Sequence, residues 1–373
     1  MAAIEPYVRT EHTPDMPPPS SEIGPIHWLR INLFSNVFNS ILTIVALGLL
    51  YFTIAPFIEW AFVNADWTAP NNIGNSCKAG GGACWSFIVT RFDQFMYGFY
   101  PVEARWRVNL GFVLFALPLA CLAIEGIPYK KYFAIFLVFI YPFVAYFLFF
   151  GGEILSKVET TLWGGLFLTL VLAIVPIAVS LPLGTLLALG RRSNMPMVRM
   201  FCVGFIELPR GVPLISVLFM ASVVLPLFLP PGTYFDKVLR ALVGMSIFAA
   251  AYMAEVVRGG LQAIPKGQFE AAQAMGLSYW KMMSLVILPQ ALKIVIPGIV
   301  STFIGLFKDT TLVLIIGLLD MLNMIQSAGQ DKNWLGTSVE GYVFAAFVYW
   351  IFCFSMSRYS IYLENKLHTG HRR

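Results

Sequence analysis

Residues 254–297 read AEVVRGGLQAIPKGQFEAAQAMGLSYWKMMSLVILPQALKIVIP and form the longest polar interruption in the apolar second half of the chain. Pro265 suits the first turn of a helix, where its missing N–H costs nothing. Gly276 suits the left-handed position that closes a helix, and Ser278 can cap the next one. The stretch therefore predicts two short helices joined by a tight bend. The alanines before Gly276 add little bulk, so the surface of another protein can approach the backbone closely.

The composition indicates a membrane protein. Of 373 residues, 58% are hydrophobic and 12% are charged, about half the charged share of soluble domains, and the mean hydropathy is +0.73. The net charge of +5 is modest, and we expect no nucleic-acid partner. The histidines lie near the two ends of the chain and predict no metal site; they are His12, His27, His368 and His371.

Eight apolar stretches are long enough to cross a hydrocarbon core of about 30 Å. They are residues 37–58, 108–124, 132–150, 161–189, 212–229, 238–257, 292–318 and 341–362. We therefore expect an all-α membrane protein with about eight transmembrane helices. The expected parts are a flexible tail at 1–36, three helices within 37–150 with an outside loop at 64–107, a five-helix core at 161–363 with a polar loop at 259–291, and a tail at 364–373.

Basic residues set the expected orientation of these helices. Lys and Arg are more frequent in the segments that this topology places inside, as the positive-inside rule requires. Both termini and the 259–291 loop are then cytoplasmic, and the 64–107 loop is outside. In that outside loop Cys77 and Cys84 flank the segment KAGGGA, whose glycines let a small ring close, so we predict a disulfide. The alternative is a pair of free thiols.

The 259–291 loop carries a spaced motif. Glu270-Ala271-Ala272 is followed after three residues by Gly276, and after nine more by Val286-Ile287-Leu288-Pro289. This pattern resembles the EAA loop of ABC-importer permeases, with Val286 in place of Ile. The words AEVVRGGLQAIPKGQ, LPQALKIVIPG and LFKDTTLVLIIGL resemble the polar amino acid permease family (histidine, glutamine and general L-amino-acid importers). The M-type subunit of the general importers (AapM or BztC type) is similar to this chain.

The resemblance implies a MetI-like core and a transport subunit of the bacterial inner membrane that imports L-amino acids. It implies as partners ABC ATPase subunits, a second permease subunit that is related but not identical, and a periplasmic amino-acid-binding protein. ATP and Mg would sit on the ATPase, because this chain has no G-x-x-x-x-G-K-[ST] phosphate loop. The residues implied to dock the ATPase are Glu270, Ala271, Ala272, Gly276, Leu288 and Pro289. The alternatives are a secondary transporter or channel for small polar solutes, and a loop that lies on the bilayer surface.

Four polar residues interrupt the apolar stretch at 292–318, namely Lys308, Asp309, Thr310 and Thr311. Neighbouring Lys and Asp residues inside a span both need partners, and a broken helix there would suit a zwitterionic amino acid. Two hypotheses stay open for this segment. It contacts the substrate, or it forms a structural ion pair with neighbouring spans.

Two acidic and basic pairs lie near the ends of spans. Glu255 and Arg258 are three residues apart on one helical face, which favours a structural ion pair. Glu207 and Arg210 belong to the word IELPRGVP, where Pro209 and Pro213 make a straight helix unlikely. For that pair we favour a role in a gate or in packing over direct contact with a ligand.

Overall fold

The computed structural model describes residues 24–68, 77, 81–124, 126–153, 155–228, 230 and 235–367. The chain divides into two compact units. Unit 1 is Met1–Asp66 with Ala79–Ala83, and unit 2 is Trp67–Lys78 with Cys84–Arg373. The described residues form helices and contain no strand longer than an isolated bridge. The predicted all-α class is confirmed.

Unit 1 consists of two helices, α1 (Pro25–Asn32) and α2 (Val37–Ile58), and a π-helical extension, Glu59–Val63. The Asn36 side chain caps α2 by accepting a hydrogen bond of 2.8 Å from the Asn39 N–H. The helix α1 lies inside the predicted flexible tail at 1–36, which corrects that prediction for its last third. Pro25 opens α1 because its fixed φ suits a first helical position; residues 1–23 lie outside the described part.

Seven helices of the described chain are long and apolar enough to cross a membrane, and one bent pair of helices would make an eighth. The seven are Val37–Val63, Val102–Ala123, Lys130–Phe150, Gly165–Arg191, Lys237–Ala263, Ile296–Ile316 and Ser338–Leu367. They match seven of the eight predicted stretches, with ends that differ by a few residues. The helix α16 (Ser338–Leu367) runs into the predicted tail at 364–373, and residues 368–373 lie outside the described part.

The eighth predicted stretch, at 212–229, is part of the bent pair. The helix α8 (Pro196–Arg210) and the helix that begins with α9 (Leu214–Phe219) and ends at Phe228 meet at 106°. Pro213 precedes α9 and has no N–H for a continuous helix, and it disfavours the helical conformation at the residue before it. The expected break at this point is therefore present.

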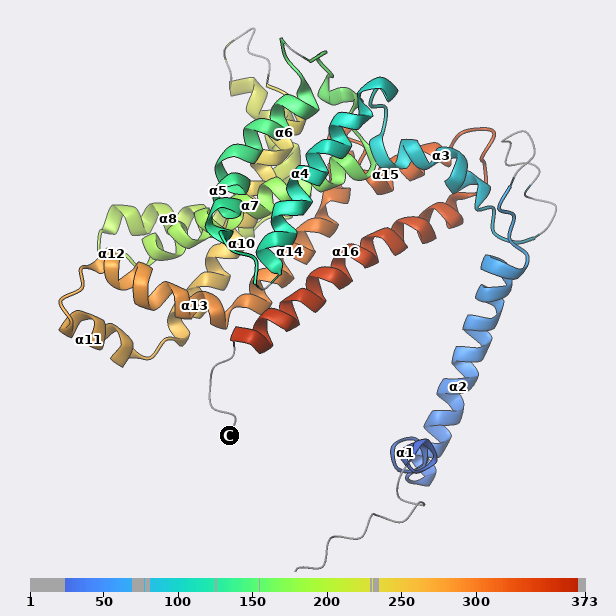
Figure 1. Cartoon of the computed structure of the whole chain (residues 1–373), viewed down its shortest axis with the longest axis horizontal. Helices are drawn as coiled ribbons and strands as arrows, with labels where there is room; N and C mark the ends of the chain where they lie inside the picture. Colours follow the sequence, from blue (N-terminus) through green and yellow to red (C-terminus); the bar gives the residue numbers. More distant parts are fainter. Residues whose placement is uncertain are drawn as a thin grey trace, which may run out of the picture. The chain divides into compact units, whose positions relative to one another are not determined.

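The centre of unit 2 is the contact between α7 (Gly165–Arg191) and α10 (Lys237–Ala263) (Figure 1). A Cβ atom at Gly184 of α7 would lie 2.7 Å from the Cβ of Met253 in α10. Only glycine allows the two backbones to approach so closely. Small buried residues of α10, among them Ala250 and Ala254, line the same contact.

Two further helices, α4 (Arg105–Ala123) and α6 (Tyr141–Phe150), pack on α7 through aromatic side chains. The helix α5 (Lys130–Ile135) packs against α4. The rings of Phe149 and Phe167 lie 5.0 Å apart in an edge-to-face arrangement. The Arg107 side chain is buried and donates hydrogen bonds of 2.8 and 2.7 Å to Ser156. Arg107 belongs to α4, which begins at Arg105, so the last residues of the predicted loop at 64–107 are helical.

The same predicted loop also contains α3 (Ser86–Tyr97), which corrects its description as a loop. At the Gly165 end of α7, this helix packs against α15 (Met321–Ala328) and α16. The remaining helices of unit 2, α11 (Lys266–Ala274), α12 (Tyr279–Met282), α13 (Leu288–Ile294) and α14 (Ile296–Asp309), follow α10 in sequence. Figure 1 shows α11, α12 and α13 at one end of unit 2, and α3 and α15 at the other.

Candidate functional site

The 259–291 loop folds into two helices joined by a bend. The helix α11 ends in a Schellman motif, in which the Gly276 N–H bonds the Gln273 carbonyl at 2.9 Å and the Leu277 N–H bonds the Ala272 carbonyl at 3.3 Å. Gly276 has φ +71°, the left-handed conformation that the sequence predicts. Pro265 stands just before the first helical residue instead of within the first turn, and Ser278 precedes α12 without a side-chain capping bond.

The exposed face of this bend is the surface that a partner can reach. Glu270, Ala271 and Gly276 are exposed, whereas Ala272 is buried. Ala272 packs in an apolar cluster with Met282 and Ile287. The expectation that Ala272 leaves room for a partner is therefore corrected, because this methyl group seats α11 on its own chain.

Two exposed apolar side chains of the loop escaped the sequence reasoning. Met275 is 81% exposed and Trp280 is 66% exposed. Large apolar residues on either side of a glycine bend, in a polar loop, are the signal that could have found them. Leu288 is half-buried, whereas Pro289, in the first turn of α13, is exposed.

A cluster of five charged side chains lies beside this loop, at the Arg191 end of α7. Arg210 Nη1 lies 3.5 Å from Glu207 Oε2, and Arg258 Nη2 lies 2.7 Å from Glu255 Oε2. Arg191 joins the two pairs, because its Nη1 lies 2.8 Å from a carboxylate oxygen of each glutamate. Sequence reasoning named the two pairs and missed Arg191, which ends α7 and resembles any basic residue at the end of a span.

The polar residues at 308–311 lie where α14 passes into a 3₁₀ segment, Thr310–Ile316, without a break. Thr310 is buried and its hydroxyl bonds the Phe307 carbonyl at 2.8 Å, while the Thr311 hydroxyl bonds the Lys308 carbonyl at 3.0 Å. The helix therefore offers no break of the kind that would suit a zwitterionic amino acid. Lys308 is exposed and Asp309 half-buried, and neither forms an ion pair with another described residue.

Residues 180–369 match the family of inner membrane components of binding-protein-dependent transport systems. The chain belongs to this family. The inner membrane amino-acid ABC transporter permease protein YhdY of Escherichia coli (strain K12) is 56% identical over 345 residues, which are 92% of this chain and 93% of that protein. The glutamate/glutamine/aspartate/asparagine transport system permease protein BztC of Rhodobacter capsulatus is 41% identical over 435 aligned residues, 98% of this chain and 99% of that protein.

A shorter relative matches only part of the chain. The glutamate/aspartate import permease protein GltK of Escherichia coli O6:H1 is 34% identical over 207 residues, which are 54% of this chain and 91% of that protein. The predicted membership and the MetI-like permease fold are confirmed. The chain is a multi-span transport subunit of the inner membrane, and it is not an enzyme.

The permease has a buried carboxylate that sequence reasoning did not single out. The side chain of Asp320 is fully buried and caps α15 by accepting a bond of 3.1 Å from the Asn323 N–H. Its second oxygen accepts a bond of 2.9 Å from the Tyr349 hydroxyl. Burial raises the pKa of this carboxyl to about 6, although these hydrogen bonds lower it. Among the described residues, no three His, Cys, Asp or Glu side chains are placed to hold a metal ion.

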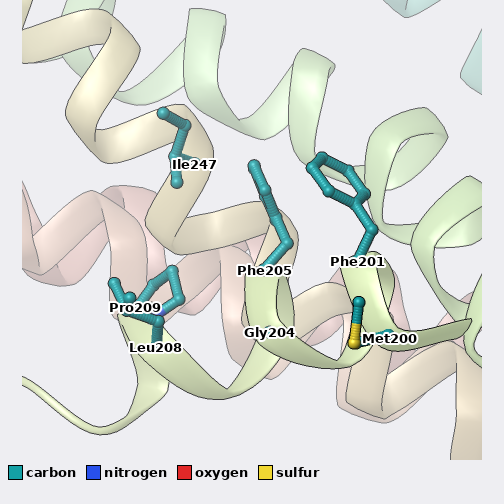
Figure 2. A pocket seen from close by; sticks show the side chains of 7 residues that line it. All are labelled: Met200, Phe201, Gly204, Phe205, Leu208, Pro209 and Ile247. Atoms are coloured by element: carbon teal, nitrogen blue, oxygen red, sulfur yellow. The ribbon is translucent and has the colours of Figure 1, made fainter. Parts of the chain in front are cut away.

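The permease also has an apolar hollow of about 360 Å³ on α8. Figure 2 shows it lined by side chains of α8, with Ile247 contributed by α10. Its lining residues are Met200, Phe201, Gly204, Phe205, Leu208, Pro209 and Ile247. This lining offers no charged or hydroxyl group to an amino acid, and none of the predicted substrate residues belongs to it.

Cys77 and Cys84 of the permease form a disulfide, which is the pairing that their spacing predicts. The Cys84 N–H donates a bond of 3.0 Å to Glu340 Oε1, in the first turn of α16. The Ser86 hydroxyl lies 3.1 Å from each of the two sulfur atoms. Cys84 is therefore fastened to the last helix of the core.

Proposed function

We propose that this permease imports L-amino acids as one of two permease subunits of an ATP-driven transporter. The full-length similarity to YhdY and BztC, whose names specify amino-acid transport, carries this proposal. The 259–291 loop supports it further, because the loop carries the docking motif and exposes Glu270, Ala271 and Gly276. The second permease subunit is a related, non-identical chain, and a periplasmic amino-acid-binding protein delivers the substrate.

The ATPase subunit docks on the bend between α11 and α12. Glu270 and Ala271 are exposed there, and Glu270 forms no ion pair with another described residue, so it is free to pair with a basic group of the ATPase. Met275 and Trp280 add exposed apolar area, of the kind that anchors protein interfaces. ATP and Mg²⁺ bind to the ATPase, which supplies the phosphate-binding loop that this sequence lacks.

The termini and the 259–291 loop face the cytoplasm, and the segment at 64–107 faces the periplasm. The distribution of Lys and Arg supports this orientation. The disulfide between Cys77 and Cys84 supports it as well, because disulfides persist in the periplasm and are rare in the cytoplasm.

Asp309 and Lys308 contact the substrate on its way through the membrane. A half-buried carboxylate inside a span calls for a cationic partner, and the ammonium group of an amino acid is one. The exposed Lys308 ammonium offers the matching partner for the substrate carboxylate. Thr310 and Thr311 bond backbone carbonyls of their own helix and hold the helix at this point.

Co-purification tests the docking of the ATPase, and uptake measurements test the contact of Asp309 with the substrate. The tagged permease, extracted from membranes of cells that express the whole transporter, should carry the ATPase subunit with it. Asp309→Asn should raise the half-saturating amino-acid concentration ten- to hundred-fold, as loss of a charge-assisted hydrogen bond of about 1.5–3 kcal/mol predicts. It should leave the amount of bound ATPase unchanged, and Asp309→Glu should recover part of the affinity. Uptake that needs no ATPase would favour a secondary transporter or channel instead.

A further inference from the structure

Two helices of the permease carry the same five-residue pattern, E-x-x-R-G. Residues 207–211 read ELPRG at the end of α8, and residues 255–259 read EVVRG in the last third of α10. In each word the glutamate and the arginine pair across one helical turn. Arg210 also lies 3.8 Å from Glu255, so the first word reaches the second.

Arg191 is the residue on which the two words converge. Its Nη1 is 2.8 Å from Glu207 Oε1 and 2.8 Å from Glu255 Oε1. A guanidinium can donate to two carboxylates at once, which an ammonium does with less geometric specificity. The last turn of α7 thereby holds the end of α8 against α10.

The next residue, Arg192, holds the 259–291 loop. Its Nη1 donates a bond of 3.2 Å to the Leu261 carbonyl, and its guanidinium carbon lies 5.6 Å from the centre of the Phe269 ring. Phe269 directly precedes Glu270, the exposed acid of the docking bend. Of these two consecutive arginines, Arg192 therefore contacts the docking helix and Arg191 contacts the two E-x-x-R-G segments.

The ion pairs of Arg191 lead through Glu207 and Arg210 to the bend between α8 and α9. Arg210 is the last residue of α8, and the following helix leaves at 106° after three residues. A shift of Glu207 and Arg210 therefore changes where the bent span points. The side chains of the cluster are between 16% and 50% exposed, and ion pairs this accessible to solvent exchange partners at little cost.

We propose that Arg191 and Arg192 transmit the movement of the docked 259–291 loop to the bend between α8 and α9. This inference rests on the proposed docking of an ATPase. When the ATPase moves α11, the contact with Phe269 carries Arg192 along, and Arg191 changes its position between Glu207 and Glu255. The end of α8 then follows Glu207. Both arginines are positioning residues, and neither needs to touch the substrate.

The test uses the complete transporter, purified with all its subunits and reconstituted in lipid vesicles. Three quantities are measured for each variant: ATPase subunit bound per permease, ATP hydrolysed, and amino acid taken up. Arg191→Gln should leave the bound ATPase unchanged and lower the uptake per ATP at least tenfold. Arg191→Lys should give an intermediate value. Arg199→Gln is the matched control, because Arg199 lies nearby on α8 without an ion pair among the described residues, and its ratio should equal that of the wild type.

A double-variant comparison separates transmission from simple stabilisation. The variant Arg191→Gln with Glu207→Gln should lose no more coupling than Arg191→Gln alone, because both changes remove the same link. The inference would be overturned if the double variant lost uptake per ATP by the product of the two single losses. It would also be overturned if Arg191→Gln lowered the amount of permease and left the uptake per ATP unchanged. Absence of the ATPase from the wild-type preparation would overturn the proposed docking itself, which is a different result.

Discussion

The two ends of α7 share apolar packing but differ in their charged contacts. At the Gly165 end, α3, α15 and α16 enclose a packed cluster that contains Phe87, Phe95 and Trp334, each nearly inaccessible to solvent. At the Arg191 end, α7 also packs on α8 and α10 through an apolar cluster that includes Ala188 and Ile206, and its last residue adds ion pairs between partly exposed side chains. The helix has 27 residues, so about 40 Å separates the two ends.

This difference has an energetic meaning. Burial of one large apolar side chain contributes about 1.5–3 kcal/mol, and several act together in the cluster around Phe87. A solvent-accessible ion pair contributes about 0–1 kcal/mol. Apolar packing therefore resists rearrangement at both ends. Only the ion pairs make the Arg191 end adaptable, because they can change partners at low cost, and the Gly165 end is the rigid end of the helix.

The largest expected effect concerns the docking bend at the adaptable end. Gly276→Leu should abolish ATP-coupled uptake, because a leucine disfavours the left-handed conformation by about 1–2 kcal/mol and places bulk on the docking face. A Cβ atom at Gly276 meets no described atom within 4 Å, so the permease itself should fold and reach the membrane. Uptake in vesicles and the amount of permease in the membrane are the two measurements.

Gly276→Asn is the matched control for that variant. Asparagine adopts the left-handed conformation more readily than leucine does, so this variant should retain more uptake at equal abundance. If Gly276→Leu transports normally at normal abundance, the bend does not carry the ATPase.

A smaller effect is expected at the rigid end, where Asp320 is buried. Its pKa in the folded protein is about 6, against an ordinary value of about 3.9 in the unfolded chain. The folded state therefore holds the proton more tightly, and the stability that this group contributes is present below about pH 4 and is lost as the pH rises through about 6. The difference of about two pKa units corresponds to about 3 kcal/mol.

Asp320→Asn should remove this dependence. Thermal unfolding of the purified permease between pH 4 and pH 7 should show a steeper loss of stability for the wild type than for the variant. Asn keeps an oxygen for the α15 cap, so the fold should survive. Identical pH profiles for the two proteins would mean that the Asp320 carboxyl is not held in an apolar environment, and the Gly165 end would then be less rigid than its packing indicates.

The sequence predicted the parts of the molecule that depend on local chemistry. Length and hydropathy located the spans, and Gly276 located the bend of the 259–291 loop. Pro209 and Pro213 together indicated an irregular helix, and the break lies at Pro213 while Pro209 stays inside α8. These features follow from residues close together in the chain. The helix α3 was missed because its apolar residues serve a cluster built with α15 and α16, more than 200 residues away in the sequence.

The candidate site was predicted less completely, for a related reason. The pairs Glu207 with Arg210 and Glu255 with Arg258 are three residues apart, so helical spacing alone reveals them. Arg191 lies 16 residues from Glu207 and 64 from Glu255, and only the packing of three helices brings it between them. Likewise, Ala272 matches a motif in sequence, but its direction depends on how α11 sits on Met282 and Ile287.

The smallest expected effect concerns the disulfide at the rigid end. The bond between Cys77 and Cys84 closes a short segment, and a ring of this size stabilises by at most about 2–3 kcal/mol on the chain-entropy estimate. The segment is also held by the bond from the Cys84 N–H to Glu340 and by the packing around Phe87. Replacing both cysteines by serine should therefore leave the permease folded and its uptake close to that of the wild type.

Labelling in intact cells tests both the bond and its side of the membrane. An impermeant thiol reagent should label neither Cys77 nor Cys84 until a reductant is added from outside, because both sulfurs are bonded and the proposed orientation places the segment in the periplasm. A variant with the three other cysteines replaced, at 121, 202 and 353, removes background labelling. Labelling without reductant would show free thiols, and labelling only after lysis would place the segment in the cytoplasm. If the double serine variant lost uptake, the disulfide, and not the apolar cluster, would be what holds the rigid end of α7.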